Sequence, residues 1–163
     1  MANSIPETIA LEVVARLEAI TIANGYTFDN AGVTRVNRNA NDWRPRNYSI
    51  AVEQGSDSEN DEQTHGGNPA AIAYDLTFEI HGFIRESDTS TTASDATENA
   101  MVAAIKLALA GETNWHNWDG NATNTHWGST QPFVSREGDH SGVTVPLTVT
   151  YRISENDPFT ARA

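Results

Sequence analysis

Two segments of the chain carry apolar residues at the spacing of an amphipathic helix. The first runs from about residue 5 to 23, and its apolar stripe consists of Ile9, Val13, Leu17 and Ile20. The second runs from Asp95 to Leu109, and its stripe consists of Ala100, Met101, Ala104, Ile105, Ala108 and Leu109. Because an α-helix turns every 3.6 residues, each stripe lies on one side of its helix. We therefore expect two helices that each bury one face.

Residues typical of helix ends flank the first segment. Ser4 and Glu7 have the spacing of a capping box, in which both side chains accept hydrogen bonds from backbone N–H groups. Pro6 falls in the first turn, where its missing N–H costs nothing. The pair Asn24-Gly25 suits the left-handed backbone that follows a helix. These signals agree with helix boundaries near residues 5 and 23.

Alternation of apolar and polar residues predicts the strands. The longest pattern spans residues 71–85, with Ile72, Tyr74, Leu76, Phe78, Ile80, Gly82 and Ile84 on one face. Residues 142–153 alternate in the same way, residues 48–53 form a shorter pattern, and residues 33–36 form a weak one. We expect 48–53 to pair antiparallel with 71–85. Pro146 cannot donate to a strand ladder, which favours an edge position or a bulge there.

Two segments without a regular apolar pattern predict long loops. Residues 54–69 contain no large apolar side chain, so we expect a solvated, mobile loop that exposes Asp57, Glu59, Asp61 and Glu62. Residues 112–130 are rich in turn residues and contain Trp115, Trp118 and Trp127, with a short strand expected near 132–136. The element order predicts a single α+β domain over residues 1–163: a mostly antiparallel sheet with two amphipathic helices packed on one face.

Composition narrows the function classes. The 163 residues include 22 acidic and 10 basic side chains, for a net charge of −12, which argues against nonspecific nucleic-acid binding. The absence of cysteine excludes disulfides, thiolate metal sites and thiol catalysis. No apolar run approaches the roughly 18 residues of a membrane-spanning helix. The first ten residues lack the charged and apolar regions of a secretory signal, so we expect none.

Candidate catalytic and metal-binding residues form no known motif. The five histidines are scattered at His65, His81, His116, His126 and His140, without a helical His-x-x-x-His pair. No nucleophile elbow, phosphate-binding loop or dinucleotide fingerprint is present. We therefore expect no enzyme, no metal and no cofactor. A site where His116 and His126 flank Asp119, or a metal-dependent hydrolase, remains the less favoured alternative.

Two groups of residues are candidates for contacts with other molecules. The basic group consists of Arg35, Arg38, Arg44 and Arg46, which could pair with an acidic surface of an identical neighbour or form an ordinary basic loop. Trp115, Trp118 and Trp127 could pack their segment onto the sheet, contact a neighbouring subunit or stack on sugar rings.

The whole pattern resembles the tail terminators of tailed bacteriophages, also known as tail completion or minor tail proteins. The resemblance covers nearly the full length of the chain. It lies in the opening helix with Leu11–Leu17 and Gly25, the strands at 48–53 and 73–85 around an acidic connection, the Ala-rich helix at 95–109 with a tryptophan-bearing segment after it, and the terminal strand Val143–Arg152 closed by Asn156-Asp157-Pro158.

The resemblance implies a structural virion protein without catalytic residues, made in the host bacterial cytoplasm and placed at the head-proximal end of the tail. Proteins of this family form rings, commonly hexameric, that cap the tail tube, stop its polymerisation and offer a docking surface to the neck. The implied partners are further copies of the chain, the tail tube protein and a neck or head-completion protein. Genome DNA would pass without specific binding, and no membrane takes part.

Within this hypothesis the arginine and tryptophan groups are the expected subunit or tail interface. The acids of residues 54–69 are expected to face the channel or solvent, where like charge prevents DNA from sticking. The alternative hypothesis is a carbohydrate-binding or receptor-contacting virion module that uses the three tryptophans.

Overall fold

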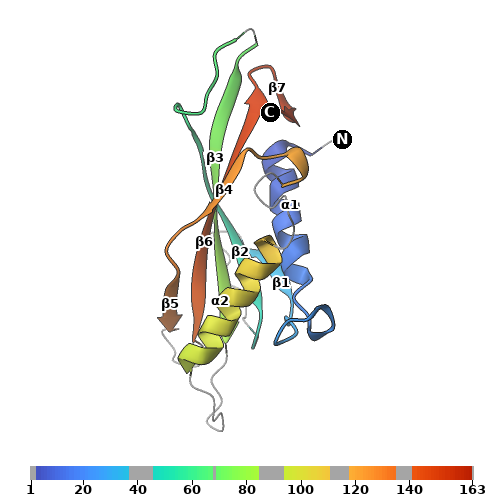
Figure 1. Ribbon diagram of the computed structural model, residues 1–163, viewed down its shortest axis with the longest axis vertical. Helices are drawn as coiled ribbons and strands as arrows, with labels where there is room; N and C mark the ends of the chain where they lie inside the picture. The colour runs from blue at the N-terminus through green and yellow to red at the C-terminus, as the bar shows by residue number, and fades with distance from the viewer. Residues whose placement is uncertain are drawn as a thin grey trace.

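The computed structural model describes residues 3–36, 46–67, 69–84, 94–110, 118–134 and 141–162. The elements, in chain order, are α1 (Ile5–Glu18), the 3-10 helix η1 (Ile22–Asn24), β1 (Val33–Val36), β2 (Ile50–Glu59), β3 (Ala71–Ile84), α2 (Ser94–Ala110), the 3-10 helix η2 (Trp118–Gly120), β4 (Asn124–Trp127), β5 (Gln131–Val134), β6 (Ser141–Ser154) and β7 (Asp157–Ala161) (Figure 1). They form an α+β fold, which confirms the predicted fold class.

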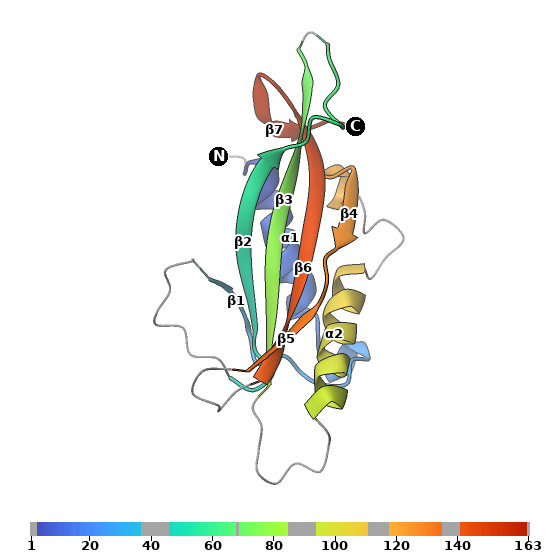
Figure 2. The same cartoon turned by 90° about the vertical axis from the view of Figure 1, so that its left-hand side faces the viewer.

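All seven strands belong to one sheet. Its central order is β1-β2-β3-β6-β4, and β5 and β7 also pair with β6. Every pairing is antiparallel except that of β1 with β2. β3 and β6 pair without interruption from Ala71 opposite Ser154 to Ile84 opposite Ser141. Figure 2 shows β2, β3 and β6 running side by side along the length of the molecule.

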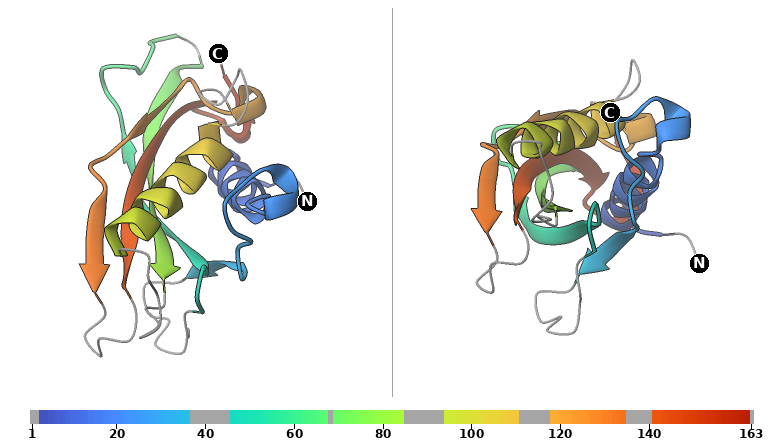
Figure 3. Two further views of the ribbon diagram at one scale, coloured as in Figure 1. Left: turned by 60° about the horizontal axis from the view of Figure 1, so that its bottom comes forward. Right: turned by 90° about the horizontal axis from the view of Figure 1, so that it is seen from below.

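Both long helices cover the same face of this sheet. In Figure 2 α1 lies behind the strands and α2 lies to the right of β6, and Figure 3 shows the two helices together on one side of the sheet. Their buried side chains are those of the predicted stripes, including Ile9, Val13 and Leu17 on α1. We name this the helix face and the opposite one the outer face. Neither α1 nor α2, nor any other helix in the described part of the chain, is long and apolar enough to cross a membrane.

α1 ends earlier than predicted because a later segment takes up its last carbonyl groups. The Asn30 side-chain amide donates to the backbone oxygens of Glu18 and Ile20, at 3.1 and 2.9 Å. The Ser4 side chain makes no capping bond, so the predicted capping box is wrong. The Ser4 carbonyl instead accepts from the backbone and hydroxyl of Thr8. A tertiary contact, which helical periodicity cannot show, therefore ends this helix.

β2 continues past its predicted end at residue 53, so residues 54–59 of the expected loop at 54–69 are strand. The ladder shifts by one residue between Gln54 and Asp57, where Gly55 and Ser56 together oppose Thr77. A Cβ atom on Gly55 would overlap the Thr77 hydroxyl, so the bulge requires glycine at this point. The absence of apolar side chains led to the wrong prediction, since backbone pairing rather than burial holds this segment.

Two short strands were not predicted. β4 lies within the 112–130 segment expected to be a loop, and β7 begins at Asp157, inside the predicted break at Asn156-Asp157-Pro158. Both attach to β6 by backbone pairing. They are too short and too polar to produce a period-two pattern of their own. The weak strand expected at 33–36 and the short strand expected near 132–136 are confirmed as β1 and β5.

Pro146 does not lie at a sheet edge, but the alternative prediction of a bulge fits the register, because residues 128–130 stand against only residues 145 and 146. It lies in β6, which pairs with β3 on one side and with β5 and β4 on the other. β5 pairs with residues 141–144 and β4 with residues 147–150, so Pro146 falls between the two short strands. Its carbonyl accepts from the Gly128 N–H at 2.9 Å. Both neighbouring ladders are interrupted at this point, which accommodates a residue that has no N–H to donate.

Gly82 of β3 lets α2 approach the sheet closely. A Cβ atom at this position would lie 2.5 Å from Met101 Cγ and 2.9 Å from its Sδ. Met101 is fully buried, so its side chain has no free space into which to move. The small residue is thus part of the packing of α2 on the helix face.

We expect Gly82→Ala to destabilise the fold by about 1–3 kcal/mol, because the added methyl group overpacks the core. In a Met101→Ala background the same replacement should cost much less, since the overlapping atoms are gone. Chemical denaturation of the wild type, the two single variants and the double variant gives the coupling free energy between positions 82 and 101. Gly66→Ala is the matched control, because a Cβ atom there meets nothing within 4 Å. Equal costs in both backgrounds would contradict the packing argument.

Candidate functional site

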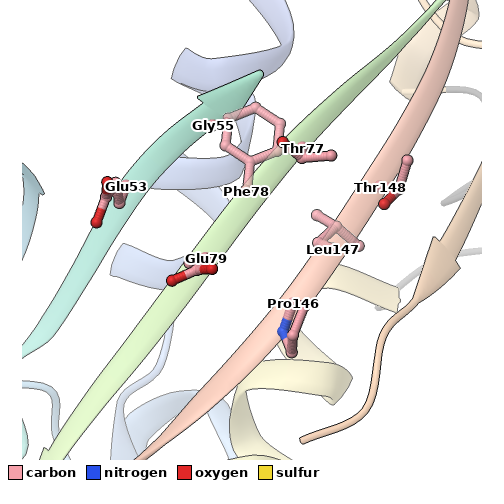
Figure 4. Close-up of a pocket in the computed structure, with 8 residues that line it drawn as sticks. All are labelled: Glu53, Gly55, Thr77, Phe78, Glu79, Pro146, Leu147 and Thr148. Carbon is pink, nitrogen blue, oxygen red and sulfur yellow. The ribbon is translucent and has the colours of Figure 1, made fainter. Parts of the chain in front are cut away.

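The outer face of the sheet is polar and slightly hollowed. A depression of about 400 Å³ lies over β2, β3 and β6 (Figure 4). Its lining consists of Glu53, Gly55, Thr77, Phe78, Glu79, Pro146, Leu147 and Thr148. Within the described residues no helix covers this face (Figures 1 and 3). In the described part of the chain, the outer face is therefore a surface left open to another molecule.

Three titratable side chains meet beside this depression. Glu53 of β2 and Glu79 of β3 are direct partners in the antiparallel ladder. His81 Nε2 lies 3.9 Å from Glu53 Oε2 and 3.8 Å from Glu79 Oε2. The other ring nitrogen, Nδ1, lies 3.0 Å from the hydroxyl of Thr144 on β6. The sequence analysis missed this cluster because it depends on the register between two strands.

An aromatic patch adjoins the cluster on the outer face. The rings of Phe83 and Phe133 meet edge to face with centroids 5.3 Å apart, and Phe133 lies 6.3 Å from the His81 ring. Val134, the last residue of β5, is 72% exposed. Because side chains alternate along a strand, Val134 points to the face opposite that of Phe133, so the patch on the outer face consists of the aromatic rings.

The acids of the 54–69 segment do not share one environment. Asp57 lies on β2, and the bulge pairs it with the core residue Leu76. Its Oδ2 accepts a 2.7 Å hydrogen bond from the hydroxyl of Tyr151, whose ring is buried. Partial burial raises the pKa of Asp57 above its ordinary value, and the Tyr151 hydrogen bond opposes that rise. Asp57 therefore lies on a strand rather than in the expected loop, but it is exposed, as predicted, and its carboxylate also has a partner within the chain.

The other three acids are exposed. Glu59 ends β2, and Asp61 and Glu62 lie in the turn that follows. Figure 2 shows this β2–β3 connection projecting beyond the rest of the sheet at one end of the molecule. We call these three residues the acidic tip. Their carboxylates face solvent, one of the two environments expected for them.

The arginines of the basic group are not equivalent. Arg35 on β1 forms a 2.7 Å ion pair with Glu7 of α1, and its second nitrogen donates to Gln54 at 3.2 Å. It thus has partners within its own chain, which satisfy its charge there. Arg46 is exposed. Outside the described residues lie Arg38 and Arg44.

The tryptophans also differ from one another in burial and contacts. Trp118 is 1% exposed, and its Nε1–H donates to the Thr125 hydroxyl at 2.7 Å. The Arg16 guanidinium lies 4.4 Å from the centre of its ring. Trp118 therefore packs its segment onto the fold and is not accessible to a subunit or a sugar, which corrects its place among the expected interface residues. Trp127 is half-buried, and Trp115 lies outside the described residues.

One side of β2 carries unpaired backbone groups. β1 pairs with β2 only from Ile50 to Glu53. Along residues 54–59 no other strand of the described chain lies on that side. The Asn60 N–H donates to the Ala73 carbonyl at 2.8 Å, so the N–H groups at 58 and 60 point toward β3. Because the direction alternates along a strand, those at 57 and 59 point away from it.

Comparisons with known proteins leave the family of this chain open. No family model and no curated protein matches it. Among solved structures, a chain from "Virion of native gene transfer agent (GTA) particle" is similar, with 10% sequence identity and a TM-score of 0.43. The match covers 93% of this chain and 92% of that one. A likeness this loose describes a similar arrangement of elements and identifies neither a family nor a function.

The raised pKa of Asp57 predicts a pH-dependent effect of Asp57→Asn. A carboxyl whose pKa is higher in the folded chain stabilises the fold fully below its unfolded pKa, near 3.9, and this contribution is lost as pH rises through the folded value. The asparagine carbonyl can still accept from Tyr151. Asp57→Asn should therefore raise thermal stability near neutral pH, and the gain should shrink in acid.

Thermal unfolding at several pH values measures this difference. Asp61→Asn in the exposed turn is the matched control, because it removes the same charge without a buried partner. If both variants change stability equally at every pH, the effect belongs to net charge rather than to the site of Asp57.

Proposed function

We propose that this chain is a structural subunit of a virion that assembles into a closed ring at the head-proximal end of a phage tail. The ring caps the tail tube, stops its polymerisation and offers the surface that docks to the neck. This proposal extends the family resemblance of the sequence. Its partners are further copies of the chain, the tail tube protein and a neck or head-completion protein.

The unpaired edge of β2 is the observation that carries the proposal. A strand edge with free N–H and C=O groups is a template for pairing with another chain. The edge at residues 54–59 lies next to the open outer face, so a neighbour could contact both. A contact between two different patches on identical subunits is heterologous, and it generates a ring when its rotation closes.

The surface also offers the asymmetry that termination requires. A terminator must bind the growing tube on one side and refuse a further tube ring on the other, so its two sides need different chemistry. The acidic tip supplies one surface and the exposed Arg46 supplies another of opposite charge. Carboxylates near a channel would also keep passing DNA from binding, since like charges repel.

The edge model predicts that Glu59→Pro weakens self-association. Proline removes the N–H of residue 59, which points away from β3, so the β2–β3 ladder keeps its hydrogen bonds. Glu59→Ala is the control, because it removes the same side chain and keeps the N–H. Sedimentation velocity over a range of concentrations should show wild type and Glu59→Ala forming a closed oligomer and Glu59→Pro shifted toward monomer. A wild-type chain that stays monomeric in solution and in virions would contradict the ring.

The termination role predicts a tail-length defect for Arg46→Glu. Reversing this exposed charge should weaken contacts with an acidic neighbour, more so at low salt, because exposed charge pairs are screened over roughly 8–10 Å at physiological ionic strength. Electron microscopy of cells that make only the variant should show overlong, headless tubes. Arg162→Glu near the chain end is the control. Tails of normal length with normal infectivity would contradict both the role of Arg46 and the assignment as a terminator.

A further inference from the structure

The outer face holds two like charges directly opposite one another. Glu53 and Glu79 are direct partners in the β2–β3 ladder. Like charges directly opposite one another destabilise a sheet. Both backbones are held by the ladder, so the carboxylates can separate only by swinging their side chains. A single ion could bind one carboxylate oxygen from each of them.

His81 is oriented toward these two carboxylates. Its Nδ1 is within hydrogen-bond distance of the Thr144 hydroxyl, at 3.0 Å. If Nδ1–H donates to that hydroxyl, Nε2 presents its lone pair to the carboxylate oxygens 3.8 and 3.9 Å away. A lone pair facing two carboxylates is unfavourable without a cation. A hydrogen bond that fixes the far ring nitrogen is the arrangement found for histidines that bind metals.

We propose that Glu53, Glu79 and His81 bind a divalent transition-metal ion of the zinc class. One oxygen of each glutamate and Nε2 of the histidine can act as ligands, and these atoms lie within 4.8 Å of one another. Ligands at 2.0–2.2 Å from a tetrahedral ion are about 3.5 Å apart, so small side-chain rotations close the site. An imidazole ligand favours zinc-like ions over magnesium and calcium, which prefer oxygen ligands alone.

The site would retain an open coordination position. Three protein ligands leave the fourth place of a tetrahedral ion to water or to a group from another molecule. Glu53 and Glu79 also line the depression of about 400 Å³ on the outer face, which gives that position access to solvent. The histidine side chain is 21% exposed and Glu79 is 59% exposed, so the ion is bound at the surface. The bound ion would tie β2 to β3 on this face.

Isothermal titration of the chelator-treated full chain with zinc chloride tests the proposal. We expect one ion per chain, with affinity at least about tenfold weaker in His81→Gln and in Glu79→Gln. His126→Gln is the matched control, because this exposed histidine lies on β4, away from the cluster, and should leave the affinity unchanged. An excess of magnesium should not displace the zinc. Zinc should also shift the ring resonances of His81 in the NMR spectrum.

Several outcomes would overturn the site. Absence of saturable binding would do so, as would equal affinity in wild type, His81→Gln and Glu79→Gln. Loss of binding in His126→Gln alone would place the ion elsewhere. Should His81→Gln fail to fold, the more exposed Glu79→Gln decides the question.

Discussion

Each residue of β3 from Ala71 to Ile84 has a partner on β6, and this paired ribbon constrains the position of every other element. β2 adds to one side of the ribbon, and β4, β5 and β7 add to the other. The alternate apolar residues of the two long strands form one continuous surface, which the helices cover. The depth of α2 on that surface is then set by Gly82 against Met101. The polar residues that alternate with these apolar residues along the two strands lie on the outer face.

The long elements could be predicted because each carries its own signal. Seven apolar residues at period two define β3, and the stripes of α1 and α2 define their buried faces. The features of the fold that the sequence did not predict depend on contacts between segments that are distant along the chain. Asn30 determines where α1 ends, backbone pairing to β3 extends β2 past residue 53, and β4 and β7 exist only as additions to β6. Local periodicity contains none of this information.

The candidate sites were less predictable than the fold for the same reason. The acidic tip was predicted from composition, because carboxylates without apolar neighbours stay in water. Arg35, Trp118 and Asp57 were placed in interfaces or loops, yet each finds a partner inside the chain: Glu7, Thr125 and Tyr151. The cluster of Glu53, Glu79 and His81 needs the strand register, which became known only with the fold.

The bulge at Gly55 and Ser56 also restricts how the length of the chain can change. Since side chains alternate between the two faces of a strand, deleting either residue would exchange the faces for everything beyond it. Ser58 would then take the place of Asp57 beside the Tyr151 hydroxyl, and the carboxylate would move to the outer face. Insertions and deletions in this hairpin should therefore be tolerated at the acidic tip, beyond Glu59, and rejected at the bulge. The hairpin can therefore change in length at its tip, while each residue at its base must stay on the face of the sheet that it now occupies.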